Sequence, residues 1–265
     1  MHFSLSSDTV ALHARVLGTG FPIVVLHGVF GSGDNWGTFG KELAQHYQVH
    51  LLDLRNHGRS PHADAFDYAH MAADVVAYLD AQKIATCFLI GHSMGGKTAM
   101  WVAALAPGMI KKAMIVDIAP RGYPAHHSLY IAGMRAVHPA TLSNRAEAET
   151  RMAAHVADAG IRSFLLKNLG RSANGGFEWK HNLDVIVRDI DYVGRSLPQE
   201  AQIAQPILFV SGGLSDYILP SDDKEILTRF PLGKVETIAG AGHWVQVDKP
   251  NELLQLALAF FGDAN

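Results

Sequence analysis

A serine lies at the centre of the pentapeptide Gly-His-Ser-Met-Gly, residues 91–95, whose spacing is that of a nucleophile elbow. The apolar run 87–90 precedes it and a segment with helical spacing, 97–105, follows it, so the pentapeptide lies at a strand-to-helix turn. Such a turn strains the serine backbone, and the flanking glycines let strand and helix approach closely. The pattern predicts Ser93 as an exposed nucleophile.

The same segment also matches a phosphate-binding loop. Residues 91–98 read GHSMGGKT and fit the pattern G-x-x-x-x-G-K-[ST], in which Lys97 would contact phosphate. Asp117, which ends a later apolar run, would then bind magnesium. A strand before and a helix after suit both interpretations, so the local pattern leaves both open.

A serine nucleophile needs a base beside it. In a fold with such an elbow the chain order is serine, acid, histidine, which places the base on a loop after the last strand. His243 fits, because the glycine-rich stretch AGAGHW, residues 239–244, follows the strand-like run 235–238. His92 adjoins the serine, but we expect its side chain to point away and interpret it as scaffold. A phosphate-binding loop would leave His243 without a role.

Two backbone N–H groups are expected to stabilise the oxyanion, one after the nucleophile and one in the loop after an earlier strand. Met94 supplies the first. Val29 fits the second, since His27-Gly28-Val29 directly follows the strand-like run 23–26 and glycine lets the backbone come close to a substrate.

The acid that orients the histidine has two candidate positions. Asp117 ends the strand-like run after the nucleophile helix, and Asp216 lies in the loop 211–220, SGGLSDYILP. One register of that loop places Asp216 opposite His243, whereas the other places Ser215 there. A carboxylate stabilises an imidazolium better than a hydroxyl does, so we favour Asp117, keep Asp216 as the alternative, and assign Ser215 an auxiliary hydrogen bond.

These residues must be positioned by alternating strands and helices. Helical spacing over 69–82, 97–105 and 251–261 separates or follows short apolar runs. This alternation predicts an α/β fold with a mainly parallel sheet. The runs expected as buried strands are residues 23–26, 49–52, 87–90, 113–116, 207–210 and 235–238.

The alternation stops between residues 121 and 205. This span has helical spacing over 146–157 and 161–169, a turn signal at 172–176, and no convincing strand. We expect a core of residues 1–120 and 206–265, with 121–205 forming a helical cap, or lid, over the site.

Bulk properties favour a small-molecule partner. The 265 residues are 48% hydrophobic with a net charge of −3, which provides no electrostatic field to attract nucleic acid or an anionic membrane.

Cys87 is the lone cysteine, so no internal disulfide forms. The N-terminal stretch 1–8 has no leader pattern and nothing later resembles a membrane span, so we expect a cytoplasmic protein. The sequence makes no prediction of the oligomeric state.

Four motifs in order resemble the α/β-hydrolase superfamily over nearly the whole chain. They are His27-Gly28, DLRNHGRS at 53–60, GHSMGG at 91–96 and GAGHW at 240–244. The segments RNHG at 55–58, VDIAP at 116–120 and GHWV at 242–245 more closely resemble those of the YbfF-type bacterial esterases and related abhydrolase-domain proteins. That resemblance implies hydrolysis of short acyl esters and, in some members, acyl-CoA thioesters. It also implies an acid at Asp117 and a serine at Ser215, whereas the adjoining Asp216 departs from the pattern.

The predicted activity is hydrolysis of carboxylic esters of short to medium acyl chains through an acyl-enzyme, without metal or cofactor. Carbon–carbon bond hydrolases and perhydrolases share the serine and stay as alternatives, as does a catalytically silent receptor on the same fold. For a thioester, the phosphates of coenzyme A would need basic side chains. The candidates are Arg121, Arg162, Lys167 and Arg171, which equally suit a solvated surface.

Overall fold

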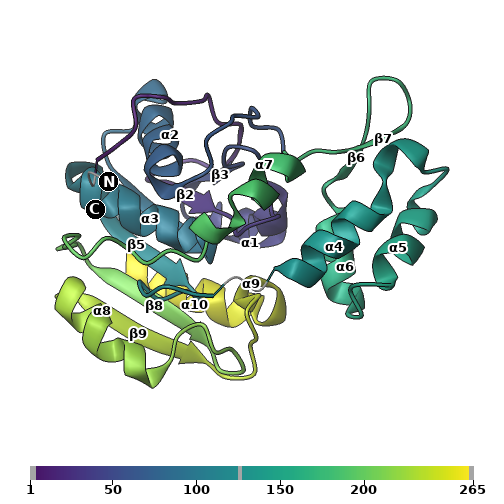
Figure 1. Ribbon diagram of the computed structural model, residues 1–265. Helices are drawn as coiled ribbons and strands as arrows, with labels where there is room; N and C mark the ends of the chain where they lie inside the picture. Colours follow the sequence, from purple (N-terminus) through teal and green to yellow (C-terminus); the bar gives the residue numbers. More distant parts are fainter. Residues whose placement is uncertain (1–3, 125–126, 263–265) are drawn as a thin grey trace.

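The computed structural model describes residues 4–124 and 127–262, and within them a seven-stranded sheet has the order β1-β3-β2-β4-β5-β8-β9 (Figure 1). Only β1 runs antiparallel to its neighbour in this sheet. Each apolar run predicted as a strand is confirmed. The strands are β1 (Ala14–Leu17), β2 (Pro22–Leu26), β3 (Gln48–Leu52), β4 (Cys87–His92), β5 (Ile110–Val116), β8 (Ile207–Gly212) and β9 (Gly233–Ile238).

Helices cover both faces of this sheet, as the alternating sequence predicts. Alternate strand residues point to opposite faces. Accordingly, Val24 and Leu26 belong to the buried cluster that includes residues of α2, α3 and α8, whereas Ile23 and Val25 belong to the cluster that includes residues of α1 and α10. Because the central strands are covered on both sides, their apolar runs are continuous rather than alternating. The helices are α1 (Gly37–Leu43), α2 (Tyr68–Ala81), α3 (Met94–Leu105), α8 (Asp223–Arg229), α9 (Val245–Asp248) and α10 (Pro250–Phe261).

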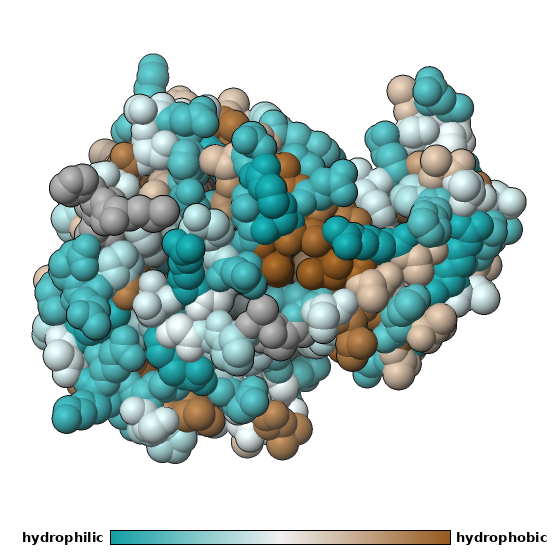
Figure 2. All heavy atoms as spheres, viewed as in Figure 1, coloured by the Kyte–Doolittle hydropathy of each residue, from teal (hydrophilic) through white to brown (hydrophobic). Residues whose placement is uncertain are grey.

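Residues 121–205, called the insertion below, lie between β5 and β8. Figure 1 shows α4, α5 and α6 standing to one side of the sheet, while α7 lies against the core. Apolar surface gathers where the insertion meets the core (Figure 2). The insertion contains α4 (Ser128–Val137), α5 (Arg145–Ala153), α6 (Ala159–Leu166) and α7 (Leu183–Arg188).

The expectation that the insertion contains no strand is wrong. Leu169–Arg171 (β6) and Phe177–Trp179 (β7) pair as a small antiparallel hairpin, and the predicted turn at 172–176 is its loop. Gly175 takes φ +84° there and donates its N–H to the Ser172 carbonyl at 3.0 Å. Strands of three residues are too short to show a period of two, and β1, also missed, is an edge strand without a buried residue.

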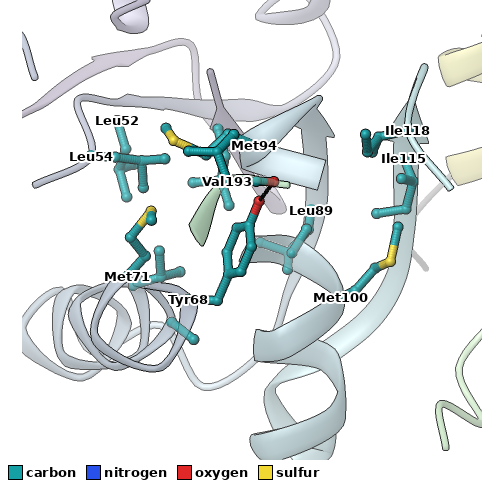
Figure 3. Close-up of a cluster of buried hydrophobic side chains, with 14 of the residues drawn as sticks. Leu52, Leu54, Tyr68, Met71, Leu89, Met94, Met100, Ile115, Ile118 and Val193 are labelled. Atoms are coloured by element: carbon teal, nitrogen blue, oxygen red, sulfur yellow. Dashed lines mark hydrogen bonds between the residues drawn. The ribbon is translucent and has the colours of Figure 1, made fainter. Parts of the chain in front are cut away.

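Tyr68 joins α2 to the end of the insertion. Its hydroxyl donates to the Val193 carbonyl at 2.7 Å within a buried cluster that includes Leu89 and Met94 (Figure 3). Burial raises the pKa of Tyr68 above its usual range, so the hydroxyl stays protonated and can donate. The returning end of the insertion is thereby fixed to the core.

Within the described parts of the chain, no helix combines the length and apolar character needed to cross a membrane. Residues 1–3 of the N-terminal stretch discussed above lie outside the described residues.

Candidate active site

Ser93 occupies the turn between β4 and α3. Its φ of 53° and ψ of −118° are a conformation that L-residues rarely adopt. The flanking glycines are required for space, because a Cβ on Gly91 would lie 2.3 Å from the Gly95 carbonyl oxygen. A Cβ on Gly95 would lie 2.4 Å from the Leu26 carbonyl oxygen. The structure therefore places Ser93 on the strained strand-to-helix turn that its sequence predicts, but the residue is buried, with 7% of its surface accessible, rather than exposed.

Asp117 lies at the end of β5 with its side chain fully buried. Its Oδ2 is 2.8 Å from Nδ1 of His243 and accepts a hydrogen bond from the Ser215 hydroxyl at 2.5 Å. Its Oδ1 accepts from the Gly212 N–H at 2.9 Å. Asp216 is exposed, and its main-chain carbonyl accepts from Arg121. Of the two acids considered, the structure brings Asp117 to the histidine.

His243 is held on three sides. Asp117 binds Nδ1, and the Tyr217 ring stacks on the imidazole with ring centroids 3.8 Å apart. His92 donates from Nε2 to the His243 main-chain carbonyl at 2.8 Å. The expectation that His92 points away from the site is therefore wrong, because the ring contacts the histidine loop. Tyr217 was missed altogether, since neither its position nor its residue type predicts a stacking partner.

The loop after β2 lies directly against Ser93. A Cβ on Gly28 would lie 3.3 Å from the Cβ of Ser93, so only glycine allows this approach without displacement. Val29 lines the cavity at Ser93. Met94 is the first residue of α3, where backbone N–H groups have no partner within the helix. Both backbone positions expected to bind an oxyanion thus flank the serine.

Two buried histidines support this loop, and sequence reasoning assigned neither a role. His27 donates from Nδ1 to the Gly28 carbonyl at 2.8 Å and accepts at Nε2 from the Leu54 N–H. His57 donates from Nδ1 to the Arg55 carbonyl and accepts at Nε2 from the Phe30 N–H at 3.2 Å. Burial lowers the pKa of His27 to about 4 and that of His57 to about 3. Both rings therefore stay neutral and keep one nitrogen as an acceptor.

A cavity of about 190 Å³ opens at Ser93 and His243 between the core and the insertion. The insertion contributes an apolar wall. A second cavity of about 420 Å³ adjoins it and shares several of its lining residues. The shared residues are Asn35, Ile161, Phe164, Trp244 and Gln246.

Three of the four basic residues considered for phosphate binding are engaged elsewhere. Arg121 pairs with Asp222, Arg162 pairs with Glu149, and Arg171 packs on a phenylalanine ring. Lys167 alone of the four lines the second cavity, together with Asp158 and Asp248.

Lys97 is fully buried and does not face the cavity at Ser93. Its Nζ donates to the main-chain carbonyls of Pro120 and Arg121, where the insertion begins, and of Arg195, on the segment that returns to the core. The lysine of a phosphate-binding loop would instead face its ligand. In the described residues, no three His, Cys, Asp or Glu side chains are arranged to hold a metal ion.

Known proteins resemble this chain over nearly all of its length. Residues 23–256 match the model of the alpha/beta hydrolase family. The chain is 38% identical to the sn-1-specific diacylglycerol lipase ABHD11 of Mus musculus, covering 90% of this chain and 80% of the mouse protein. It is 36% identical to esterase YbfF of Escherichia coli K12, covering 91% and 93%. The solved structure of a marine microorganism esterase superposes with a TM-score of 0.93 at 40% identity, covering 95% and 100%.

These similarities exclude two of the alternatives left open by the residues alone. The interpretation of residues 91–98 as a phosphate-binding loop is wrong, and so is the interpretation of the chain as a silent receptor. The chain is a carboxylester hydrolase resembling YbfF-type esterases, as expected. The chain belongs to the alpha/beta hydrolase family.

Proposed function

We propose that the chain is a serine hydrolase that cleaves carboxylic esters through an acyl-enzyme intermediate. The observation that carries this proposal is the 2.8 Å contact between Asp117 Oδ2 and His243 Nδ1, in a site whose cavity is lined by Ser93. Asp117 accepts a hydrogen bond from the Nδ1–H group of His243, which keeps the proton on Nδ1 and leaves Nε2 free to act as the base. The Ser215 hydroxyl adds a second hydrogen bond to the same carboxylate oxygen and helps to hold it in place.

In the proposed reaction, His243 Nε2 takes the proton of the Ser93 hydroxyl as the oxygen attacks the ester carbonyl. The N–H groups of Val29 and Met94 donate to the oxyanion that develops. The tetrahedral intermediate collapses as His243 returns the proton to the leaving alkoxide, which departs as an alcohol. Water then attacks the acyl-enzyme, again with His243 as base, and releases the acid and Ser93.

The cavities support esters of short to medium acyl chains. A volume of about 190 Å³ beside Ser93 is below the usual size of small-molecule pockets, and its apolar wall favours an alkyl group. The adjoining cavity of about 420 Å³ gives room for a larger leaving group, with the insertion acting as a lid. An acyl-CoA thioester is less well supported, because Lys167 shares its cavity with the carboxylates of Asp158 and Asp248 and the three arginines are engaged elsewhere.

Hydrolysis of p-nitrophenyl acetate, butyrate, octanoate and palmitate by the wild type and by Ser93→Ala tests the proposal. We expect kcat to fall by about 10⁴-fold or more in Ser93→Ala. The thermal midpoint should be maintained, and the wild type should prefer butyrate or octanoate. Ester turnover retained by the alanine variant would disprove the role of Ser93. A preference for palmitate would disprove the proposed preference for short to medium acyl chains.

A further inference from the structure

The turn that carries Val29 has an unfavourable residue at its third position. Gly28 to Gly31 form a β-turn closed by a hydrogen bond from the Gly31 N–H to the Gly28 carbonyl at 3.0 Å. Phe30, the third residue, takes φ +59°, a conformation that glycine adopts readily but other residues do not. A phenylalanine there persists only if its surroundings hold it.

Two side chains from distant parts of the chain hold Phe30, which is itself buried. His57 accepts from the Phe30 N–H at 3.2 Å, and Asn168 donates from Nδ2 to the Phe30 carbonyl at 2.6 Å. Asn168 belongs to the insertion and is only 3% exposed. The turn is therefore fixed from the core on one side and from the insertion on the other.

The contact at Asn168 begins a continuous chain of hydrogen bonds. The Phe30 carbonyl and the Gly31 N–H belong to one peptide plane, and the Gly28 carbonyl and the Val29 N–H belong to another. Asn168 donates to the carbonyl of the first plane, and the N–H of that plane donates to the carbonyl of the second. The second plane ends at Val29, which lines the cavity at Ser93. Each hydrogen bond polarises the next in such a chain, so Asn168 strengthens and orients Val29 as a donor.

Asn168 is itself fixed next to α6. Its side-chain Nδ2 also donates to the Leu165 carbonyl at 3.2 Å, and the main-chain carbonyl of Asn168 accepts from the Lys180 N–H at 2.8 Å. Phe164 and Leu165 line the cavity beside Ser93. The wall that contacts a substrate and the support of the oxyanion donor are therefore parts of one segment.

We propose that Asn168 is a positioning residue that couples the insertion to the oxyanion hole by holding the Phe30 carbonyl. The inference rests on the proposed function, because it concerns the donor assigned there to Val29. It adds that the insertion does more than enclose the substrate: it maintains a donor needed in the transition state. An insertion displaced from the core would leave Ser93 and His243 in place but weaken the stabilisation of the oxyanion.

The test is Asn168→Leu, which keeps the side-chain size but removes the donor. Asn182→Leu is the matched control, because Asn182 also lies in the insertion and donates to the core, at Asn56 Oδ1, without touching the turn. Two ligands separate the oxyanion from ground-state binding. 1,1,1-Trifluorooctan-2-one forms an oxyanion adduct with a catalytic serine, whereas octan-2-one should bind without a stable adduct.

In Asn168→Leu, we expect kcat on p-nitrophenyl butyrate to fall about tenfold and the inhibition constant of the trifluoromethyl ketone to rise by the same factor. KM and the affinity for octan-2-one should change less than about twofold, and Asn182→Leu should leave kcat within about twofold. We expect the loss of kcat to be smaller than that from removing an oxyanion donor outright, because the Val29 N–H is weakened as a donor rather than lost.

Equal losses in both leucine variants, or a lower kcat without weaker binding of the trifluoromethyl ketone, would overturn the role of Asn168 alone. A wild type that neither hydrolyses the ester nor binds the trifluoromethyl ketone would instead overturn the proposed function. If Asn168→Leu does not fold, Asn168→Ala gives the same readouts, with the same outcomes supporting or contradicting the inference.

Discussion

Asp117 combines a strained backbone with a fully satisfied carboxylate. Its φ is +50°, and its main-chain N–H donates to the Val210 carbonyl at 2.8 Å. This conformation directs the side chain toward the end of β8 and the loop after it, where Gly212 and Ser215 donate to the two carboxylate oxygens. The strain is therefore offset by contacts that fix the carboxylate beside His243.

Replacing Asp117 by Asn should lower kcat by about 10³- to 10⁴-fold, because an amide can donate to Nδ1 and so stabilise the wrong tautomer of His243. Asp216→Asn is the control, because the exposed Asp216 side chain lies in the loop after β8, next to Ser215, which contacts Asp117. This substitution should change kcat less than about threefold. Initial rates on p-nitrophenyl butyrate measure both. A collapse of activity in Asp216→Asn with normal activity in Asp117→Asn would reverse the assignment.

The choice between these acids shows where the sequence is ambiguous. Both follow strands, and the letters SGGLSDY allow two registers of the loop. In the structure, the Gly212 N–H donates to Asp117 Oδ1 and so fixes one register. Such a contact joins residues 95 positions apart. No local spacing predicts it, whereas Ser93 and His243 were predictable because their flanking residues impose the turn.

Helix α3 does more than present Ser93, because Lys97 connects it to both ends of the insertion. The Nζ atom is 3.1 Å from the Pro120 carbonyl and 2.9 Å from the Arg195 carbonyl, and it also contacts the Arg121 carbonyl. Pro120 leads out of β5 and Arg195 lies on the returning segment. One buried amine thus holds together the two junctions on which the position of the insertion depends.

Lys97→Met should lower the free energy of unfolding by about 2–4 kcal/mol, because buried carbonyls lose their donor. Burial lowers the pKa of Lys97 to about 7, so the measurement is best made by urea denaturation at pH 6, where the amine carries three donor hydrogens. Lys224→Met, at an exposed position on α8, should change stability by less than about 0.5 kcal/mol. Equal stability of Lys97→Met and the wild type would contradict this role.

Elements were predictable where burial on both faces produces a continuous apolar run. This holds for β2, β4 and β5, which lie in the interior of the sheet. The hairpin of β6 and β7 and the edge strand β1 were missed because their residues are few and partly exposed. The contacts of Lys97 were not predictable either, because they are made to main-chain carbonyls, which carry no signature of residue type.

Neutral histidines lie where the core meets the insertion. Burial lowers the pKa of His27 to about 4, of His57 and His181 to about 3, and of His92 well below its usual value. His181, in the insertion, stacks on Trp179 with ring centroids 5.2 Å apart. Among the described residues, none forms a hydrogen bond with either ring nitrogen of His181. The packed molecule therefore depends on these rings remaining uncharged.

A lowered pKa in the folded state means that the unfolded chain binds more protons below pH 6.5. The stability that depends on neutral rings is complete above pH 6.5 and is lost as the pH falls toward the folded pKa values of about 3 to 4. For each such ring, the slope of the free energy of unfolding should rise from about half of 1.4 kcal/mol per pH unit at pH 6.5 to nearly the full value near pH 5.

His181→Phe removes one titrating ring but keeps an aromatic side chain against Trp179. In urea denaturation at pH 4.5, 5.5, 6.5 and 7.5, its free energy of unfolding should fall less steeply with acid than that of the wild type. The difference in slope should correspond to about one proton fewer taken up on unfolding. Trp179→Phe perturbs the same packing without removing a titrating group, so it should shift the curve vertically without changing its slope. Parallel curves for His181→Phe and the wild type would mean that His181 gains no proton on unfolding, and the acid sensitivity of the molecule would then come from elsewhere.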